Sequence, residues 1–330
     1  MIGARLPLAF ESGLELPETG RLAVFGPRLG DDLSALPKDR TQIIQRFKPD
    51  FDAFVAKGYD CVTGTVDTYA AAIVILPRAK AEARATLAGA VAATGGGIVV
   101  VDGQKTDGVD SLLKDIRKRA SLGQVISKAH GKLFWFEGGD FADWAQDAED
   151  IQLPGGFVTR AGVFSADGAD PASQMLAEAL PKKLGRRVAD LGAGWGFLAA
   201  AILSRETVDE VHLIEADAVA LDCARRNVTD PRARFHWEDA TRFRSAEKFD
   251  TVVMNPPFHV GRAGDPGLGR AFIATAAAIL KPAGELWLVA NRHLPYEKHM
   301  AEHFREVREI SGDNRFKLLH AARPLARTAR

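Results

Sequence analysis

The chain has few cysteines, no excess charge of either sign and no long apolar segment. Two cysteines among 330 residues, Cys61 and Cys223, exclude a disulfide framework, and neither stands among other potential metal ligands. Lysine plus arginine and aspartate plus glutamate number 43 each, so composition gives no basic signature of nucleic-acid binding. The longest apolar run, residues 89–101, contains four glycines and is too short to span a bilayer. These absences predict a protein with no metal centre and no membrane segment.

What the chain does contain fits a globular protein with two domains. Hydrophobic residues make up 46% and charged residues 26% of its 330 residues, a length that suits two domains of ordinary size. An acidic stretch at 138–150 is followed by Pro154, Gly155 and Gly156, which interrupt regular structure. We therefore place the domains at 1–150 and 151–330. The first residues lack the apolar core of a signal peptide, so a cytoplasmic protein is expected.

A glycine-rich turn follows a short apolar strand in the second half. Gly192, Gly194 and Gly196 alternate with other residues, and they allow a tight turn and a close approach of the backbone to a ligand. Asp190 precedes the first glycine by two residues, where a carboxylate would repel a pyrophosphate but attract the cationic amino-acid part of S-adenosylmethionine. The alternating spacing also differs from the dinucleotide pattern Gly-x-Gly-x-x-Gly. The turn therefore favours a sulfonium cofactor over NAD.

Polar residues follow the next three strands as well. Glu215 ends the second strand, where an acid can hold a ribose diol. Asp239, followed by Ala240, comes after the third strand and can accept a hydrogen bond from an adenine amino group. Asn255 follows the fourth. Polar residues at four successive strand ends predict ligand binding at the carboxyl edge of a doubly wound α/β sheet.

The fourth strand runs into the sequence Asn-Pro-Pro-Phe. Two consecutive prolines stiffen the backbone and remove two N–H donors, which leaves carbonyl acceptors beside Asn255. The carbonyl of Pro256 and the side chain of Asn255 can each accept one N–H of a planar amine. The Phe258 ring can stack on its face. This loop is suited to holding an aromatic or amide NH₂ group for transfer chemistry.

Together these motifs resemble those of the class I S-adenosylmethionine-dependent methyltransferases. Residues 162–180, 255–259, 289–296 and 315–317 resemble, more specifically, ribosomal RNA guanine-N2 methyltransferases of the RsmC type. The resemblance covers residues from about 155 to 322. It implies a seven-stranded sheet with an antiparallel last strand, the cofactor S-adenosylmethionine, and a guanine in 16S ribosomal RNA as target. Ribosomal RNA or the small ribosomal subunit is the implied partner, and a monomer is expected.

The resemblance also assigns the site. It places Asp170, Ser173 and Gln174 at the border of the cofactor pocket, which would further include Asp190, Gly192, Gly194, Gly196, Glu215, Asp239, Ala240 and Asn255. It assigns the base-holding role to Asn255, Pro256 and Phe258. Substrate contacts are expected from Pro257, His259, Arg292 and His293.

The first half repeats the pattern of the second in a reduced form. A strand near residues 21–25 leads into a loop that lacks alternating glycines, and a later strand ends at Leu76-Pro77 without the asparagine or the aromatic residue. We read this as an internal duplication, giving tandem Rossmann-like domains of which the first is degenerate and binds no cofactor. In the resembled family such a domain supports folding and helps to hold RNA.

Other functions remain compatible with the loop at Asn255. Adenine N6 in DNA or RNA and the glutamine amide of a protein factor also present a planar NH₂ group. Large-subunit ribosomal RNA guanine-N2 enzymes share the motifs. A non-catalytic RNA-binding scaffold is the alternative of a different class, and the intact motifs of the second half argue against it.

Overall fold

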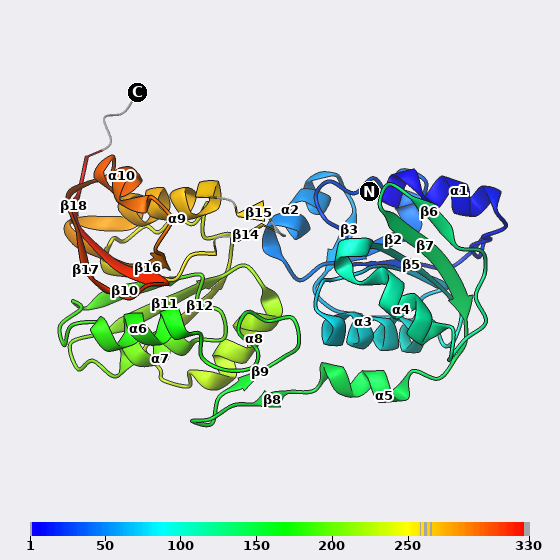
Figure 1. Ribbon diagram of the computed structural model, residues 1–330, viewed down its shortest axis with the longest axis horizontal. Coiled ribbons are helices and arrows are strands. Elements are labelled where there is room, and N and C mark those ends of the chain that lie inside the picture. Colours follow the sequence, from blue (N-terminus) through cyan, green and yellow to red (C-terminus); the bar gives the residue numbers. More distant parts are fainter. Residues whose placement is uncertain (1, 258, 261–262, 265, 327–330) are drawn as a thin grey trace. The chain divides into compact units, whose positions relative to one another are not determined.

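The structure, a computed structural model, describes residues 2–257, 259–260, 263–264 and 266–326. The chain forms two compact units (Figure 1). The first extends to Ile151 and includes Arg160–Gly162, and the second comprises Gln152–Thr159 and the chain from Val163 onward. Within the described residues, no helix combines the length and apolarity needed to cross a bilayer.

The first unit is built on one sheet of seven strands in the order β3-β2-β1-β4-β5-β7-β6. Strand β7 runs antiparallel to both of its neighbours, and the remaining pairs are parallel. The strands are β1 (Leu22–Phe25), β2 (Thr41–Ile44), β3 (Asp60–Val62), β4 (Ala71–Ile75), β5 (Ile98–Gln104), β6 (Ile126–Lys128) and β7 (Gly131–Glu137). The helices are α1 (Leu6–Glu11), α2 (Lys48–Ala56), α3 (Lys80–Ala93), α4 (Val109–Ile116) and α5 (Ala142–Ala145), with 3₁₀ turns at Ile2–Ala4, Lys38–Arg40, Lys105–Asp107 and Gln146–Ala148.

The second unit has a sheet of seven strands in the order β12-β11-β10-β13-β16-β18-β17. Here β18 is the antiparallel strand. The strands are β10 (Arg187–Leu191), β11 (Glu210–Glu215), β12 (Ala233–Trp237), β13 (Phe249–Met254), β16 (Leu280–Asn291), β17 (Phe304–Gly312) and β18 (Phe316–Pro324), and the short strands are β8 (Ile151–Gln152), β9 (Val158–Thr159), β14 (His259–Val260) and β15 (Ala263–Gly264). The helices are α6 (Pro171–Ala179), α7 (Phe197–Leu203), α8 (Ala218–Asn227), α9 (Pro266–Ile279) and α10 (Tyr296–Ala301).

Helices cover both faces of the second sheet. Leu176 of α6 and Ala199 of α7 belong to one hydrophobic core, and Ile273 of α9 and Met300 of α10 belong to the other. Because both faces are covered, the central strands are apolar without alternation, and Val252 and Val253 of β13 are both fully buried. This arrangement leaves the carboxyl ends of the parallel strands as the place where polar side chains can gather.

The two sheets have the same strand order, with the antiparallel strand in the same place. The expected tandem of Rossmann-like sheets, each with an antiparallel last strand, is confirmed. Helix α10 ends at Ala301, because the backbone N–H groups of Glu302 and His303 donate to the carbonyls three residues before them and so tighten the chain. The chain then enters β17 at Phe304.

The first unit differs from the second at its carboxyl edge. In the loop at residues 26–30, Gly26 alone has a positive φ, whereas all three glycines of the corresponding loop in the second unit do. Near the end of β5, Asp102 accepts two hydrogen bonds from the fully buried guanidinium of Arg5, at 2.5 and 2.7 Å. Arg5 also donates to the carbonyl of Lys128 at 2.9 Å. An ion pair with good geometry and an additional acceptor is the form in which buried charges are tolerated.

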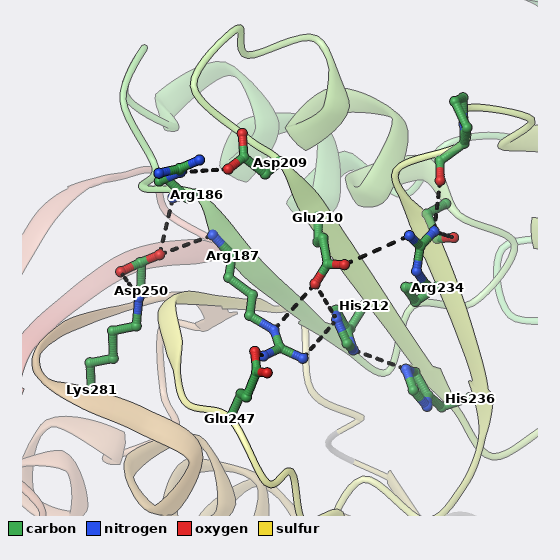
Figure 2. Close-up of polar contacts among 12 residues, drawn as sticks. Arg186, Arg187, Asp209, Glu210, His212, Arg234, His236, Glu247, Asp250 and Lys281 are labelled. Carbon is green, nitrogen blue, oxygen red and sulfur yellow. Dashed lines mark hydrogen bonds and ion pairs between the residues drawn. The ribbon is translucent and has the colours of Figure 1, made fainter.

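A histidine pair lies on two neighbouring strands of the second sheet, with His212 on β11 and His236 on β12 (Figure 2). Nδ1 of His212 is 3.0 Å from Nε2 of His236, and the two ring planes differ by 9°. Nη2 of Arg187 is 3.3 Å from Nε2 of His212. Oε2 of Glu210 is 3.4 Å from the same nitrogen, so Nε2 of His212 lies between a guanidinium donor and a carboxylate acceptor. Burial lowers the pKa of both histidines, so the pair is neutral.

This pair makes stability depend on pH. A lowered pKa in the folded state means that the unfolded chain takes up protons first as the pH falls below about 6.5. The contribution to stability is therefore complete above that pH and is lost at lower pH. We expect the urea midpoint to decrease between pH 7.5 and 5.5, and to decrease less in the double variant H212F/H236F.

The matched control is His130→Asn, which removes an exposed histidine and suits the positive φ at that position. An equal decrease in the double variant and the wild type would show that the histidine pair does not carry the effect.

Candidate functional site

The glycine turn after β10 has the backbone conformation that only glycine adopts readily. The φ angles of Gly192, Gly194 and Gly196 are +77°, +56° and +92°. A Cβ on Gly196 would lie 2.9 Å from Val228, whereas a Cβ on Gly194 would meet nothing within 4 Å. The turn thus packs on the protein at its end and presents open backbone at its centre.

Glu215 fastens this turn to the end of β11. Its Oε2 accepts a hydrogen bond from the N–H of Gly194 at 2.8 Å, and its Oε1 accepts one from the N–H of Asp217 at 2.8 Å. Burial raises the pKa of Glu215, while these two backbone donors act in the opposite direction. The residue expected to hold a ribose therefore also fixes the shape of the glycine turn.

Asp190 lies beneath the turn. Its side chain is fully buried, and neither carboxyl oxygen has a hydrogen-bond partner among the described residues. Burial, followed by the nearby Glu215, raises the pKa of Asp190 to about 8. In the ligand-free protein the carboxyl is therefore mostly protonated at neutral pH, and a contact of Asp190 with the cofactor stays a prediction.

At the edge of the sheet, Asn255 meets two residues that lie 85 and 82 positions before it in the sequence, Asp170 and Ser173. Nδ2 of Asn255 donates to Oδ2 of Asp170 and to Oγ of Ser173, each at 2.9 Å. Asp170 is the N-cap of α6, and its Oδ2 also accepts from the N–H of Ser173 at 2.9 Å. The predicted set from the segment before β10 and the loop after β13 thus forms one hydrogen-bonded group.

A cavity joins this group to the glycine turn. Its wall contains five residues of the predicted set and six that the sequence reasoning did not single out. The predicted residues are Asp170, Ser173, Gly192, Gly194 and Asn255, and the others are Phe164, Ser165, Ala193, Trp195, Phe197 and Leu198. The sequence did contain a signal for some of them, because Trp195 stands between two motif glycines and Phe164 lies in the segment 162–180.

The aromatic residues of this wall have a structural basis. Trp195 is 4% exposed and packs against Phe157 and Phe197, with ring centroids 5.2 and 5.6 Å apart. Its carbonyl accepts a hydrogen bond from Asn227 at 2.8 Å, which ties the turn to α8. Phe164 is 60% exposed, a large fraction for an apolar ring. The ring contacts of Trp195 and its hydrogen bond to Asn227 hold the turn in place.

Other predicted residues lie at the same edge without lining the cavity. Asp239 accepts from the N–H and the Oγ1 of Thr241 at 2.8 and 2.7 Å, and Ala240 is buried. Gln174 is exposed and donates to the carbonyl of Ala169. Asp239 therefore organises the turn after β12, and a contact with adenine stays a prediction.

The residues expected to contact the substrate are only partly described. Pro256 is buried and Pro257 is exposed, whereas Phe258 and the side chain of His259 lie outside the described residues. His293 is exposed. Arg292 is held by the hairpin of β17 and β18 through Glu309 at 3.0 Å, the Phe316 carbonyl at 3.1 Å and the Asp313 carbonyl. The structure thus does not bring Arg292 to the cavity wall.

The residues present fit S-adenosylmethionine. Open backbone at Gly194 allows close approach, Asp170 offers a carboxylate on the cavity wall, and Glu215 and Asp239 follow the next strands. Within the described residues one group could hold a metal ion, His299, Glu302 and His303, with ligand atoms within 4.8 Å of one another. These three residues do not line the cavity.

Comparison with known proteins agrees with this geometry. The family described as methyltransferase small domain matches residues 155–320. The ribosomal RNA small subunit methyltransferase C of Shewanella sp. (strain MR-4) is 32% identical over 266 residues, which are 76% of this chain and 77% of the relative. That of Hahella chejuensis is 31% identical over 236 residues, 67% of this chain and 68% of the relative.

A solved structure extends the similarity to both units. The T. thermophilus 16S rRNA N2 G1207 methyltransferase, RsmC, in complex with AdoMet and guanosine, has a TM-score of 0.79 and 26% identity. The match covers 94% of this chain and 90% of that chain. It therefore includes the degenerate first unit as well as the unit that carries the cavity.

The raised pKa of Asp190 predicts a distinct pH dependence. A raised pKa means that the contribution to stability is complete below the unfolded value, near 3.9, and is lost as the pH rises towards about 8. Asp190→Asn keeps the shape but has no proton to lose. We expect the urea midpoint of the wild type to fall relative to that of D190N as the pH is raised from 5 to 8.

Glu238→Gln removes an exposed carboxyl from the same edge and is the matched control. If the difference between wild type and D190N were constant from pH 5 to 8, Asp190 would be ionised throughout this range, contrary to the expectation.

Proposed function

The chain belongs to the family of ribosomal RNA small subunit methyltransferase C, and we infer that it transfers a methyl group from S-adenosylmethionine to the exocyclic N2 of a guanine in 16S ribosomal RNA. One observation carries the mechanism: Asn255, the acceptor for a planar amine, lies on the same cavity wall as the glycine turn. The two halves of the reaction therefore meet in one unit.

The chain's own residues hold the target amine. Guanine N2 is a poor nucleophile because its lone pair is delocalised into the ring. We propose that Oδ1 of Asn255 and the carbonyl of Pro256 each accept one N–H, which favours a pyramidal nitrogen and directs its lone pair at the methyl group. Phe258 stacks on the base in this proposal, and such stacking contributes about 1–3 kcal/mol.

Catalysis rests on positioning. When bound, S-adenosylmethionine would supply a methyl group on a positively charged sulfur. The lone pair of N2 would form the new N–C bond as the C–S bond breaks, the neutral thioether would leave, and one N2 proton would pass to water. We propose that the glycine turn and Asp170 hold the amino-acid end of the cofactor, Glu215 the ribose and Asp239 the adenine. A guanine within a helix must be flipped out to reach Asn255.

The target and the first unit are finer points of the same proposal. The expected target is the 16S ribosomal RNA guanine equivalent to G1207, the nucleotide named for the T. thermophilus enzyme. We propose that domain 1–150 supports the fold and contacts RNA, with exposed Lys114, Arg117 and Lys118 at the end of α4 as phosphate contacts. Lys182 and Lys183 are exposed in the second unit.

Because the proposed site uses one unit of one chain, we propose that the protein is a monomer. We also propose that it is cytoplasmic, because the ribosomal substrate is found there.

The product identifies the reaction. We expect labelled S-adenosylmethionine to yield N2-methylguanosine when the protein is incubated with naked 16S RNA or small subunits lacking the modification, followed by digestion to nucleosides. Large-subunit RNA, DNA and a protein release factor serve as parallel substrates. Label in N6-methyladenosine, in protein or in large-subunit RNA would contradict the proposal. Failure to bind S-adenosylmethionine would exclude methyltransferase activity.

Asn255→Ala tests the acceptor. We expect transfer to fall by about 10²–10³-fold, the scale seen when one transition-state hydrogen bond is removed. The dissociation constant of S-adenosylmethionine should stay close to the wild-type value in a calorimetric titration. Asn314→Ala, an exposed change, is the control. Loss of both transfer and cofactor binding would mean that Asn255 has a structural role.

A further inference from the structure

The hydrogen bonds around Asn255 give its two amide atoms different roles. We propose that Asp170 is a positioning residue that fixes the orientation of the Asn255 amide, so that Oδ1 faces the target amine. This inference rests on the proposed function and deepens it. It gives Asp170 a role in the transfer step beyond bordering the cofactor pocket.

The first step is a count of donors. The amide nitrogen of Asn255 has two N–H groups, and both are used, by Oδ2 of Asp170 and Oγ of Ser173, each at 2.9 Å. Both partners accept from the nitrogen, so the amide nitrogen has no donor left for another group. Oδ1 is the atom that can accept an N–H from a guanine amine.

Only one of the two hydrogen-bond partners determines the orientation of the Asn255 amide. A serine hydroxyl both donates and accepts, so Ser173 can satisfy either end of an amide. An ionised carboxylate only accepts, so Asp170 requires the nitrogen of Asn255 and rejects the oxygen. An asparagine amide has nearly the same shape in both orientations. The flipped form would set N–H groups against the N–H groups of the target.

The third step is that the carboxylate is itself held in place. Oδ2 of Asp170 also accepts from the N–H of Ser173 at 2.9 Å, as the N-cap of the nine-residue helix α6. Ser173 is 7% exposed. The position of the carboxylate is therefore set by the helix, and the helix is set by its core contact at Leu176.

Asp170→Asn separates orientation from folding. Asparagine is as good an N-cap as aspartate, so α6 should be retained. The new amide can donate to Oδ1 of Asn255 and allow the flipped form. We expect kcat on small subunits at saturating S-adenosylmethionine to fall at least tenfold, with KM for subunits changed less than threefold. The dissociation constant of S-adenosylmethionine should rise as well, because Asp170 is also proposed to hold the amino-acid end of the cofactor, and saturation keeps this effect out of kcat. Ser173→Ala removes one acceptor without permitting the flip and should lower kcat less than D170N.

A charge exchange makes the test reciprocal. Asn255→Asp sets two carboxylates against each other, which cannot both be ionised without repulsion. We expect low activity and a lower melting temperature for this variant. In D170N/N255D the amide and the carboxylate exchange places, so a donor again faces an acceptor and one carboxylate oxygen remains for the guanine amine. We expect at least a tenfold gain in kcat over N255D and recovery of the melting temperature.

The two readouts distinguish the possible failures. A double variant no more active and no more stable than N255D overturns the inference, as does a D170N enzyme with wild-type kcat. If the wild type labels a different amine, the proposed function fails, while the melting temperatures of the four proteins still report whether residues 170 and 255 are coupled. A D170N effect confined to cofactor affinity would assign Asp170 to cofactor binding and reject the positioning role.

Discussion

The carboxylate of Asp170 is the contact on which the geometry of the site depends. One oxygen accepts from the helix amide of Ser173 and from the side chain of Asn255, so it connects the start of α6 to the loop after β13. These elements are separated in the chain by the four strands β10, β11, β12 and β13. Without such a connection, the cofactor side and the amine side of the cavity would be positioned independently. Transfer chemistry tolerates little error in that separation.

The sequence and its resemblance to a known family predicted tandem Rossmann-like sheets of seven strands with an antiparallel last strand. For the site, the sequence predicted polar residues at the carboxyl edge of the second sheet. Strand ends carry polar residues because parallel strands are otherwise buried, which is why Glu215, Asp239 and Asn255 could be found by position alone. Helix α3, Lys80–Ala93, coincides with an alanine-rich stretch of the sequence. Local patterns of this kind are visible in one dimension.

The sequence could not predict how the predicted residues interact. Asp190 is fully buried in the central strand β10, between β11 and β13, and the sequence Asp-Leu-Gly does not report this burial. Arg292 lies after a strand end, but the hairpin at 309–316 is close enough to bind its guanidinium. The contacts of Asn255 join residues 82 and 85 positions apart, and such pairings are determined by the tertiary fold. The aromatic residues of the cavity lie within the sequence motifs, but a tryptophan such as Trp195 can equally belong to the hydrophobic core. The sequence therefore did not assign them to the cavity.

The charge of the cavity suits a cationic ligand that becomes neutral on reaction. In the free protein Asp190 is protonated at neutral pH because burial raises its pKa to about 8, so it adds no negative charge beneath the glycine turn. Asp170 provides a carboxylate on the cavity wall, and the carboxylate of Glu215 accepts hydrogen bonds from two backbone N–H groups. Opposite unit charges about 4 Å apart near a protein surface attract by on the order of 4 kcal/mol. In the proposed arrangement the ammonium group that Asp170 faces is present in the cofactor before the transfer and in the product after it, so this attraction does not distinguish the two. A second ionised carboxylate at Asp190 would bind the ammonium group of the product more tightly, and the protonation of Asp190 avoids this effect.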